Sequence, residues 1–113
     1  MDLAEASCRA AMGAPANWRF ALADQLIRAA TSVPANIAEG YGRNSTGAYL
    51  QFLKVARGSL LELETHVLLA RRIEAFGNDR SAAILQQLER VGKMLNALIK
   101  SLQQSDIQER RIG

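Results

Sequence analysis

The sequence predicts an all-α protein: an antiparallel, up-down four-helix bundle in which the first helix is short. Three observations predict it. Leu and Ala are the commonest residues of a chain that is 49% hydrophobic but only 5% aromatic, a composition that favours helices over a β-sandwich. Apolar residues recur at helical intervals along most of the chain. The breaks between these periodic segments are short, and short loops make consecutive long helices run antiparallel.

The first predicted helix is the short one. Asp2 and Glu5 form a capping pair at its start, and Gly13-Ala14-Pro15 breaks the chain after it. Such a helix cannot cover the full length of its neighbours. We therefore expect part of the apolar surface of the bundle to be covered in another way.

The second predicted helix spans residues 18–39, with Asn17 as its N-cap. Its core side comprises Leu22, Leu26, Ala29 or Ala30, Val33 and Ile37. Pro34 removes one backbone donor and is expected to kink the helix rather than end it, because the apolar period resumes beyond it. Gly40 and Gly42 are expected to end the helix, because glycine adopts a left-handed C-cap at little cost.

The third and fourth predicted helices are longer. Ser45 caps a helix that can run to Phe76, roughly 30 residues or about 45 Å. Its apolar stripe comprises Tyr49, Phe52, Leu53, Ala56, Leu60, Leu63, Val67 and Ala70. After the turn Gly77-Asn78-Asp79, the fourth helix follows with apolar residues at alternating steps of four and three. This seam comprises Ile84, Leu88, Val91, Leu95, Leu98 and Leu102.

The length of 113 residues allows one hydrophobic core but not two. We therefore expect one bundle domain over residues 1–104 and a polar tail, residues 105–113, that frays. Cys8 is the only cysteine, which excludes an internal disulfide and fits a reducing compartment. The start has no signal-peptide pattern, and no apolar run approaches the roughly 20 residues of a membrane span, so we expect a cytoplasmic protein without membrane contact.

Three segments together resemble a known family signature. Residues 27–43 read IRAATSVPANIAEGYGR, residues 52–65 read FLKVARGSLLELET, and residues 94–99 read MLNALI. They resemble bacterial four-helix-bundle proteins first noticed as reading frames inside intervening sequences of large-subunit ribosomal RNA genes. The likeness covers about residues 18–102. Its structural signature positions are Pro34, Asn36, Glu39, Gly40, Arg43, Arg57 and Gly58.

The resemblance implies an antiparallel four-helix bundle that often forms a ring-shaped homopentamer. A distant branch contains the accessory proteins of diversity-generating retroelements, which associate with a reverse transcriptase and with nucleic acid through a basic surface. Two features of this chain depart from the pattern. Its first helix is shorter, and Gly47-Ala48 replaces an acidic-aromatic start of the third helix.

The polar signature residues have a structural and a functional interpretation. A kink at Pro34 leaves a carbonyl without its donor, which Asn36 or Ser32 could supply, and Glu39 could pair with Arg43. The same residues could line a ligand pocket. We favour the structural interpretation, because buried polar groups at a kink need partners for stability alone.

The sequence contains no pattern typical of a catalytic or metal site. Glu62 and His66 are four residues apart, but a zinc or di-iron site needs three or four ligands. Ser59 has no identifiable base, and Gly40-x-Gly42 lacks the strand context and third glycine of a phosphate loop. Gly58 is expected to allow close approach of helices. We therefore expect no enzyme activity, no cofactor and no metal.

Apolar residues outside the stripes predict self-association. On the third helix, Leu50, Leu61 and Leu68 lie on one flank, and Val55, Leu69 and Ile73 lie on the other. On the fourth helix, the excess comprises Leu85, Ile99 and Met94. These residues widen the apolar arc beyond the ~100° that a surface helix needs. We expect a homo-oligomer, and the resemblance favours five subunits.

The charged residues indicate a polyanionic partner, although the net charge is only +3. Arg90, Lys93 and Lys100 lie opposite the seam of the fourth helix, and the third helix adds Arg71 and Arg72. Assembly would repeat this basic surface in every subunit. The favoured function is a non-enzymatic, homo-oligomeric accessory protein that binds RNA, DNA or a nucleic-acid enzyme weakly and without sequence preference. The alternative is a protein-protein scaffold with no nucleic-acid role.

Overall fold

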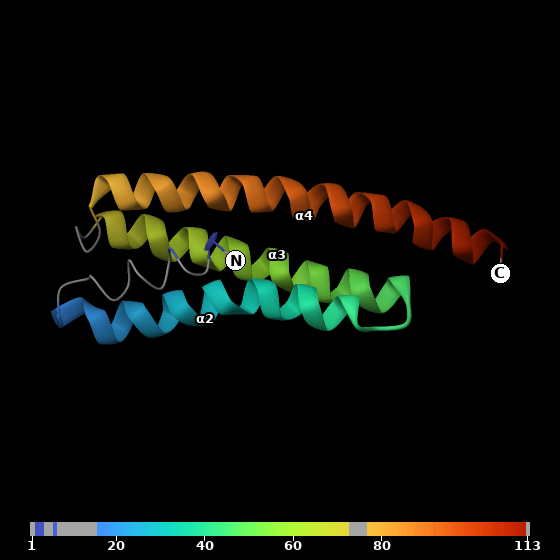
Figure 1. The fold of residues 1–113 in the computed structure, drawn as a ribbon, viewed down its shortest axis with the longest axis horizontal. Helices are drawn as coiled ribbons and strands as arrows, with labels where there is room; N and C mark the ends of the chain where they lie inside the picture. Colours follow the sequence, from blue (N-terminus) through green and yellow to red (C-terminus); the bar gives the residue numbers. More distant parts are fainter. Residues whose placement is uncertain (1, 4–5, 7–15, 73–76, 113) are drawn as a thin grey trace.

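The computed structural model describes residues 2–3, 6, 16–72 and 77–112, and these residues contain helices and no strand (Figure 1). The long helices are α2 (Ala16–Tyr41), α3 (Thr46–Arg72) and α4 (Asn78–Ile112). The all-α prediction is therefore confirmed. The expected short first helix lies mostly outside the described residues, although Leu3 is described and is buried in the core. The four-helix architecture remains a prediction.

Helix α3 is the central element, with α2 packed along one side and α4 along the other (Figure 1). Consecutive helices run antiparallel, as the short connections predict. In the part of the chain that the structure describes, the backbones of α2 and α4 do not approach each other within 8 Å. The core therefore forms around α3, and the other two helices contribute their apolar sides to it.

The core agrees with the predicted stripes except at Leu50 of α3 and on α4. Its buried residues are Leu22, Leu26, Ala29, Ala30 and Val33 of α2, Leu50, Leu53, Ala56, Leu60, Leu63, Val67 and Ala70 of α3, and Ile84, Leu88, Leu95 and Ile99 of α4. Leu98, expected in the seam, is 36% exposed, whereas Ile99 is 2% exposed. Adjacent residues differ by about 100° around a helix. Because Gly92 faces Leu60 of α3, the buried side of α4 is turned toward Ile99.

Gly40 lies inside α2 at the closest described approach of a glycine to another helix. A Cβ atom at this position would lie 2.7 Å from Phe52 Cβ and 2.9 Å from Tyr49 Cδ1, both on α3. The expected left-handed termination is wrong, because neither Gly40 nor Gly42 has a φ in the left-handed range and the helix continues to Tyr41. Glycine is required here because it lets the two helices meet.

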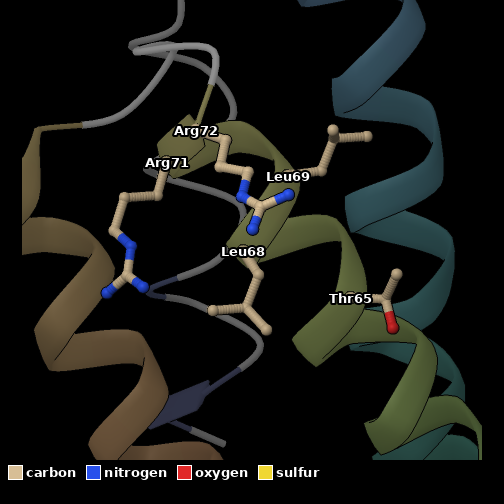
Figure 2. Close-up of a pocket in the computed structure, with 5 residues that line it drawn as sticks. All are labelled: Thr65, Leu68, Leu69, Arg71 and Arg72. Atoms are coloured by element: carbon tan, nitrogen blue, oxygen red, sulfur yellow. The ribbon is translucent and has the colours of Figure 1, made fainter.

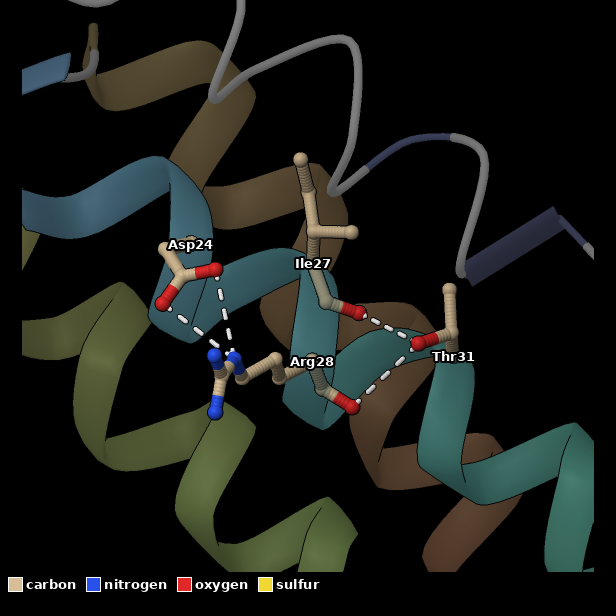
Figure 3. A network of polar contacts seen from close by, with 4 residues as sticks. All are labelled: Asp24, Ile27, Arg28 and Thr31. Carbon is tan, nitrogen blue, oxygen red and sulfur yellow. Dashed lines mark hydrogen bonds and ion pairs between the residues drawn. The ribbon is translucent and has the colours of Figure 1, made fainter. Parts of the chain in front are cut away.

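The outward side of α2 carries polar side chains that are paired within the helix (Figure 3). The Thr31 hydroxyl donates to the carbonyl oxygens of Ile27 at 2.7 Å and Arg28 at 3.3 Å. The Arg28 guanidinium donates to the Asp24 carboxylate at 3.2 Å. These groups therefore stabilise the helix locally and need no partner from another helix.

The C-terminal part of α4 extends past the α2–α3 turn (Figure 1). Helix continues through residues 105–112, which the sequence predicts to fray. Asp106 forms an ion pair with Arg110 at 3.4 Å, and the Thr46 hydroxyl donates to the Glu109 carboxylate at 3.3 Å. Negative charge near the first turn of α3 is favourable to the N-terminus of that helix. The contact with Thr46 and the ion pair therefore stabilise the helical conformation of the C-terminal end of α4.

Replacing Gly40 with Ala is expected to destabilise the fold by roughly 1–3 kcal/mol, because the added Cβ overlaps Phe52. The matched control is Gly47→Ala in the first turn of α3, where the new Cβ would lie 3.9 Å from an Asp106 carboxylate oxygen, an ordinary contact distance. That substitution is expected to stabilise α3 by roughly 0.5–1 kcal/mol. Urea unfolding followed by circular dichroism, at a fixed protein concentration, measures both. Equal effects of the two substitutions would contradict the close approach at Gly40.

Candidate nucleic-acid and oligomer surfaces

Three signature side chains form a polar network between α2 and α3. The Asn36 amide donates to the Ser32 carbonyl at 2.8 Å and to the Ser32 hydroxyl at 2.9 Å. The Ser32 hydroxyl in turn forms a 2.7 Å hydrogen bond with the Ser59 hydroxyl of α3. All three residues are half-buried, so the network fixes the position of one helix against the other. Ser59, considered from the sequence as a nucleophile, thus forms part of the contact between α2 and α3.

Pro34 lies within α2, and its missing N–H leaves the carbonyl of Ala30 without the usual donor. The expected repair by Asn36 or Ser32 is not found among the described hydrogen bonds, because Asn36 bonds the Ser32 carbonyl instead. Asn36 therefore bonds a carbonyl two residues beyond the one that the kink argument assigns to it.

The turn between α2 and α3 is held by a charged and aromatic cluster. Arg43 pairs with Glu39 at 2.6 Å, as the sequence predicts, and its guanidinium lies 5.0 Å from the centre of the Phe52 ring. Tyr41 and Tyr49 meet edge to face at 6.1 Å between ring centres. About half of the Arg43 and Glu39 side chains is exposed, so this pair contributes modestly to stability. The cluster orders the turn.

The described residues offer little for catalysis or metal binding. No group of three or more His, Cys, Asp or Glu side chains within them could hold a metal ion. Glu62 is exposed and His66 is half-buried on α3. Cys8 lies outside the described residues. No helix among the described residues is both long and apolar enough to cross a membrane.

The outward side of α3 carries exposed apolar residues. We call this the α3 outer face; it comprises Val55, Gly58, Leu61, Thr65, Leu68 and Leu69. Leu61 is 61% exposed and Val55 is 52% exposed. Among the described residues, no other helix lies within 4 Å of a Cβ built on Gly58, so the expected close approach of helices is not found here. The Thr65 hydroxyl donates to the Leu61 carbonyl at 3.1 Å.

One residue expected on this surface belongs to the core, and another lies outside the described residues. Leu50 is 5% exposed and belongs to the core, because it continues the stripe of Leu53 and Ala56 at helical steps of three. Ile73 lies outside the described residues. Sequence reasoning missed the exposed Tyr41, Ile27 and Ile107.

The five predicted cationic residues are all exposed, but they do not form one cluster. Lys93 and Lys100 lie about one turn before and one turn after Asn96 of α4, which accepts a 3.3 Å hydrogen bond from Arg57 of α3. Arg90 lies one turn before Lys93. We call the set Arg57, Arg90, Lys93 and Lys100 the cationic border.

Acidic residues neutralise only part of this border. Lys93 pairs with Glu89 at 3.3 Å, and this is the one ion pair that the described residues make with Arg90, Lys93 or Lys100. From Arg90 to Lys100 the border covers about 15 Å of helix, at 1.5 Å per residue. It therefore presents a row of positive charge to solvent.

Arg71 and Arg72 lie apart from the border, in the last turn of α3. They line an open pocket of about 460 Å³ together with Thr65, Leu68 and Leu69. Figure 2 shows the Arg72 guanidinium between Leu68 and Leu69, whereas the Arg71 side chain extends toward α4. We call this the α3 end pocket.

Comparisons with known proteins agree with this helical arrangement. A solved structure of a protein of unknown function from the S23 ribosomal protein family of Bacteroides thetaiotaomicron is similar, with a TM-score of 0.68 and 26% sequence identity. The match covers 70% of this chain and 73% of that one. No curated protein matches the sequence. The model of the 23S rRNA-intervening sequence protein family matches residues 1–97, so the chain belongs to this family, which confirms the resemblance in the sequence.

Proposed function

We propose that this chain is a non-enzymatic, cytoplasmic accessory protein that forms a homo-oligomer, with five subunits favoured, and binds RNA or DNA weakly and without sequence preference. The observation that carries the proposal is the cationic border, in which exposed Lys93 and Lys100 lie one turn on either side of Asn96, the α4 residue that is bonded to Arg57 of α3. A nucleic-acid enzyme is a further possible partner of the same surface.

Self-association is supported by the middle of the α3 outer face, at Val55, Gly58 and Leu61. A fully buried leucine stabilises an interface by roughly 1.5–3 kcal/mol relative to an exposed one, and Leu61 is mostly exposed in the single chain. The Thr65 hydroxyl is already bonded to the backbone, so covering it leaves no unsatisfied donor. Gly58 leaves room for a second helix near the centre of the face. A contiguous apolar face of this kind marks an interaction site.

Backbone-directed nucleic-acid binding is supported by the spacing and exposure of the cations. Side chains that neutralise phosphates release counterions, and this term carries no sequence information. The described aromatic residues do not accompany the cationic border, because Tyr41, Tyr49 and Phe52 gather at the α2–α3 turn. Stacking with bases therefore has no platform there. In an oligomer, the border is repeated in each copy and its field adds up.

The alternative is a protein-protein scaffold whose charge serves other ends. The exposure of Leu61 and Val55 favours it, because these side chains recognise protein surfaces and not phosphates. Binding to generic nucleic acid distinguishes the two functions.

Replacing Leu61 with Ser is expected to weaken self-association at least tenfold, because the buried leucine contributes roughly 1.5–3 kcal/mol at each interface. Ile107→Ser is the matched control, since Ile107 is similarly exposed but lies near the end of α4. Light scattering at micromolar concentration gives the mass of each protein. A monomeric mass for the unsubstituted chain would refute self-association, and an unchanged oligomer in Leu61→Ser would exclude Leu61 from the interface.

Replacing Arg90, Lys93 and Lys100 together with Gln is expected to weaken binding to all nucleic-acid sequences alike while leaving the oligomer intact. Each lost phosphate contact should lower the slope of log K against log salt by about 0.9 on duplex DNA. The triple variant Arg28→Gln, Arg110→Gln, Arg111→Gln removes the same charge away from the border. Fluorescence anisotropy with a generic duplex and a generic single strand, at low and moderate salt, measures the effect. An assembled protein that binds neither would favour the scaffold.

A further inference from the structure

The α3 end pocket combines an apolar floor with two cations. Leu68 is 36% exposed and Leu69 is 48% exposed, while Arg71 and Arg72 are exposed beside them. Figure 2 shows the Arg72 guanidinium between the two leucines and the Arg71 guanidinium on the α4 side of Leu68, with Thr65 one turn below. The pocket therefore offers apolar contact and charge within a single turn of helix.

Arg71 and Arg72 are the charged groups of the pocket that are available to recognise a ligand. The only hydroxyl in the pocket belongs to Thr65, and it is bonded to the Leu61 carbonyl at 3.1 Å. Within the described residues, neither Arg71 nor Arg72 has a carboxylate within 4 Å. A bound group that fits here must thus supply both apolar atoms and negative charge.

Stabilisation of the helix end does not account for the whole pocket. Cations in the last turn of a helix are favourable to its dipole, which explains Arg71 and Arg72 but not the exposed leucines beside them. Phosphate binding would likewise need the cations and no apolar floor. Thr65, Leu68, Leu69 and Arg72 follow the spacing i, i+3, i+4, i+7, the pattern with which one helix face contacts another.

We propose that the α3 end pocket binds an amphipathic helix of a partner protein, one that carries carboxylates at the edge of its apolar face. Its apolar side chains would pack on Leu68 and Leu69. Its carboxylates would accept hydrogen bonds from Arg71 and Arg72, whose planar guanidinium groups suit bidentate pairing. The site lies at the end of α3, beyond Val55 and Leu61 at the middle of the α3 outer face. It goes beyond the proposed function, since it stands whether or not the cationic border binds nucleic acid.

The test uses the full chain and a fluorescently labelled amphipathic helical peptide with a leucine face edged by glutamates. Two matched peptides carry Gln or Lys in place of the glutamates. The glutamate peptide should bind about tenfold more tightly than the Gln peptide, the effect of two solvent-exposed charge pairs, and the Lys peptide should bind least. Arg71→Gln with Arg72→Gln should remove this preference, whereas Arg110→Gln with Arg111→Gln should retain it. Leu68→Ser with Leu69→Ser should weaken all three peptides.

Several outcomes would overturn the proposal. Equal binding of the Glu and Gln peptides, or no binding, would remove the carboxylate-bearing helix as the ligand. A lower oligomer mass in Leu68→Ser with Leu69→Ser would make the pocket a contact between copies of this chain. Loss of nucleic-acid binding in Arg71→Gln with Arg72→Gln, with the peptide preference unchanged, would assign these arginines to nucleic acid. The Arg90, Lys93, Lys100 triple variant should keep the peptide preference, which separates this test from that of the proposed function.

Discussion

Burial of one stripe of α3 is the constraint on which the rest of the structure depends. The stripe from Leu50 to Ala70 is covered from one side by α2 and from the other by α4. Leu53, Leu63 and Val67 lose all exposure, and a fully buried aliphatic side chain of this size contributes roughly 1.5–3 kcal/mol. Because α2 and α4 both pack against this stripe, the opposite side of α3 has no partner helix within the described chain. The α3 outer face is a direct consequence of the central position of the helix.

Periodicity in the sequence predicts the helices well but not how they meet. The stripes of α2 and α3 emerge from spacing alone, and Ser45 is confirmed as the N-cap of α3 by its 3.1 Å bond to the Ala48 N–H. The contact at Gly40 and the Ser32–Ser59 bond depend on residues far apart in the chain. A single sequence carries no signal for such pairings, so the sequence predicts a left-handed C-cap at Gly40 instead of a helix contact.

The candidate surfaces were predictable to a similar degree. Exposed positions opposite a stripe follow from the helical repeat, which locates Leu61, Lys93 and Lys100 correctly on the outside. The approach of Arg57 to the cations of α4 was not predictable, since the Arg57–Asn96 bond joins residues far apart in the chain. A rotation of one residue, about 100°, also decides that Ile99 and not Leu98 is buried. Such rotations depend on which side chains fit between two helices.

The order in which the described helices pack has a kinetic consequence. Each packed pair, α2 with α3 and α3 with α4, joins helices that are neighbours in the chain. Contacts of this kind close short loops, so their contact order is low, and proteins rich in such contacts fold in microseconds to milliseconds. Encounter between two chains depends on concentration and is slower under dilute conditions. A newly made chain therefore completes its own fold first, and any partner of α3 meets a rigid, preorganised helix instead of an unfolded segment.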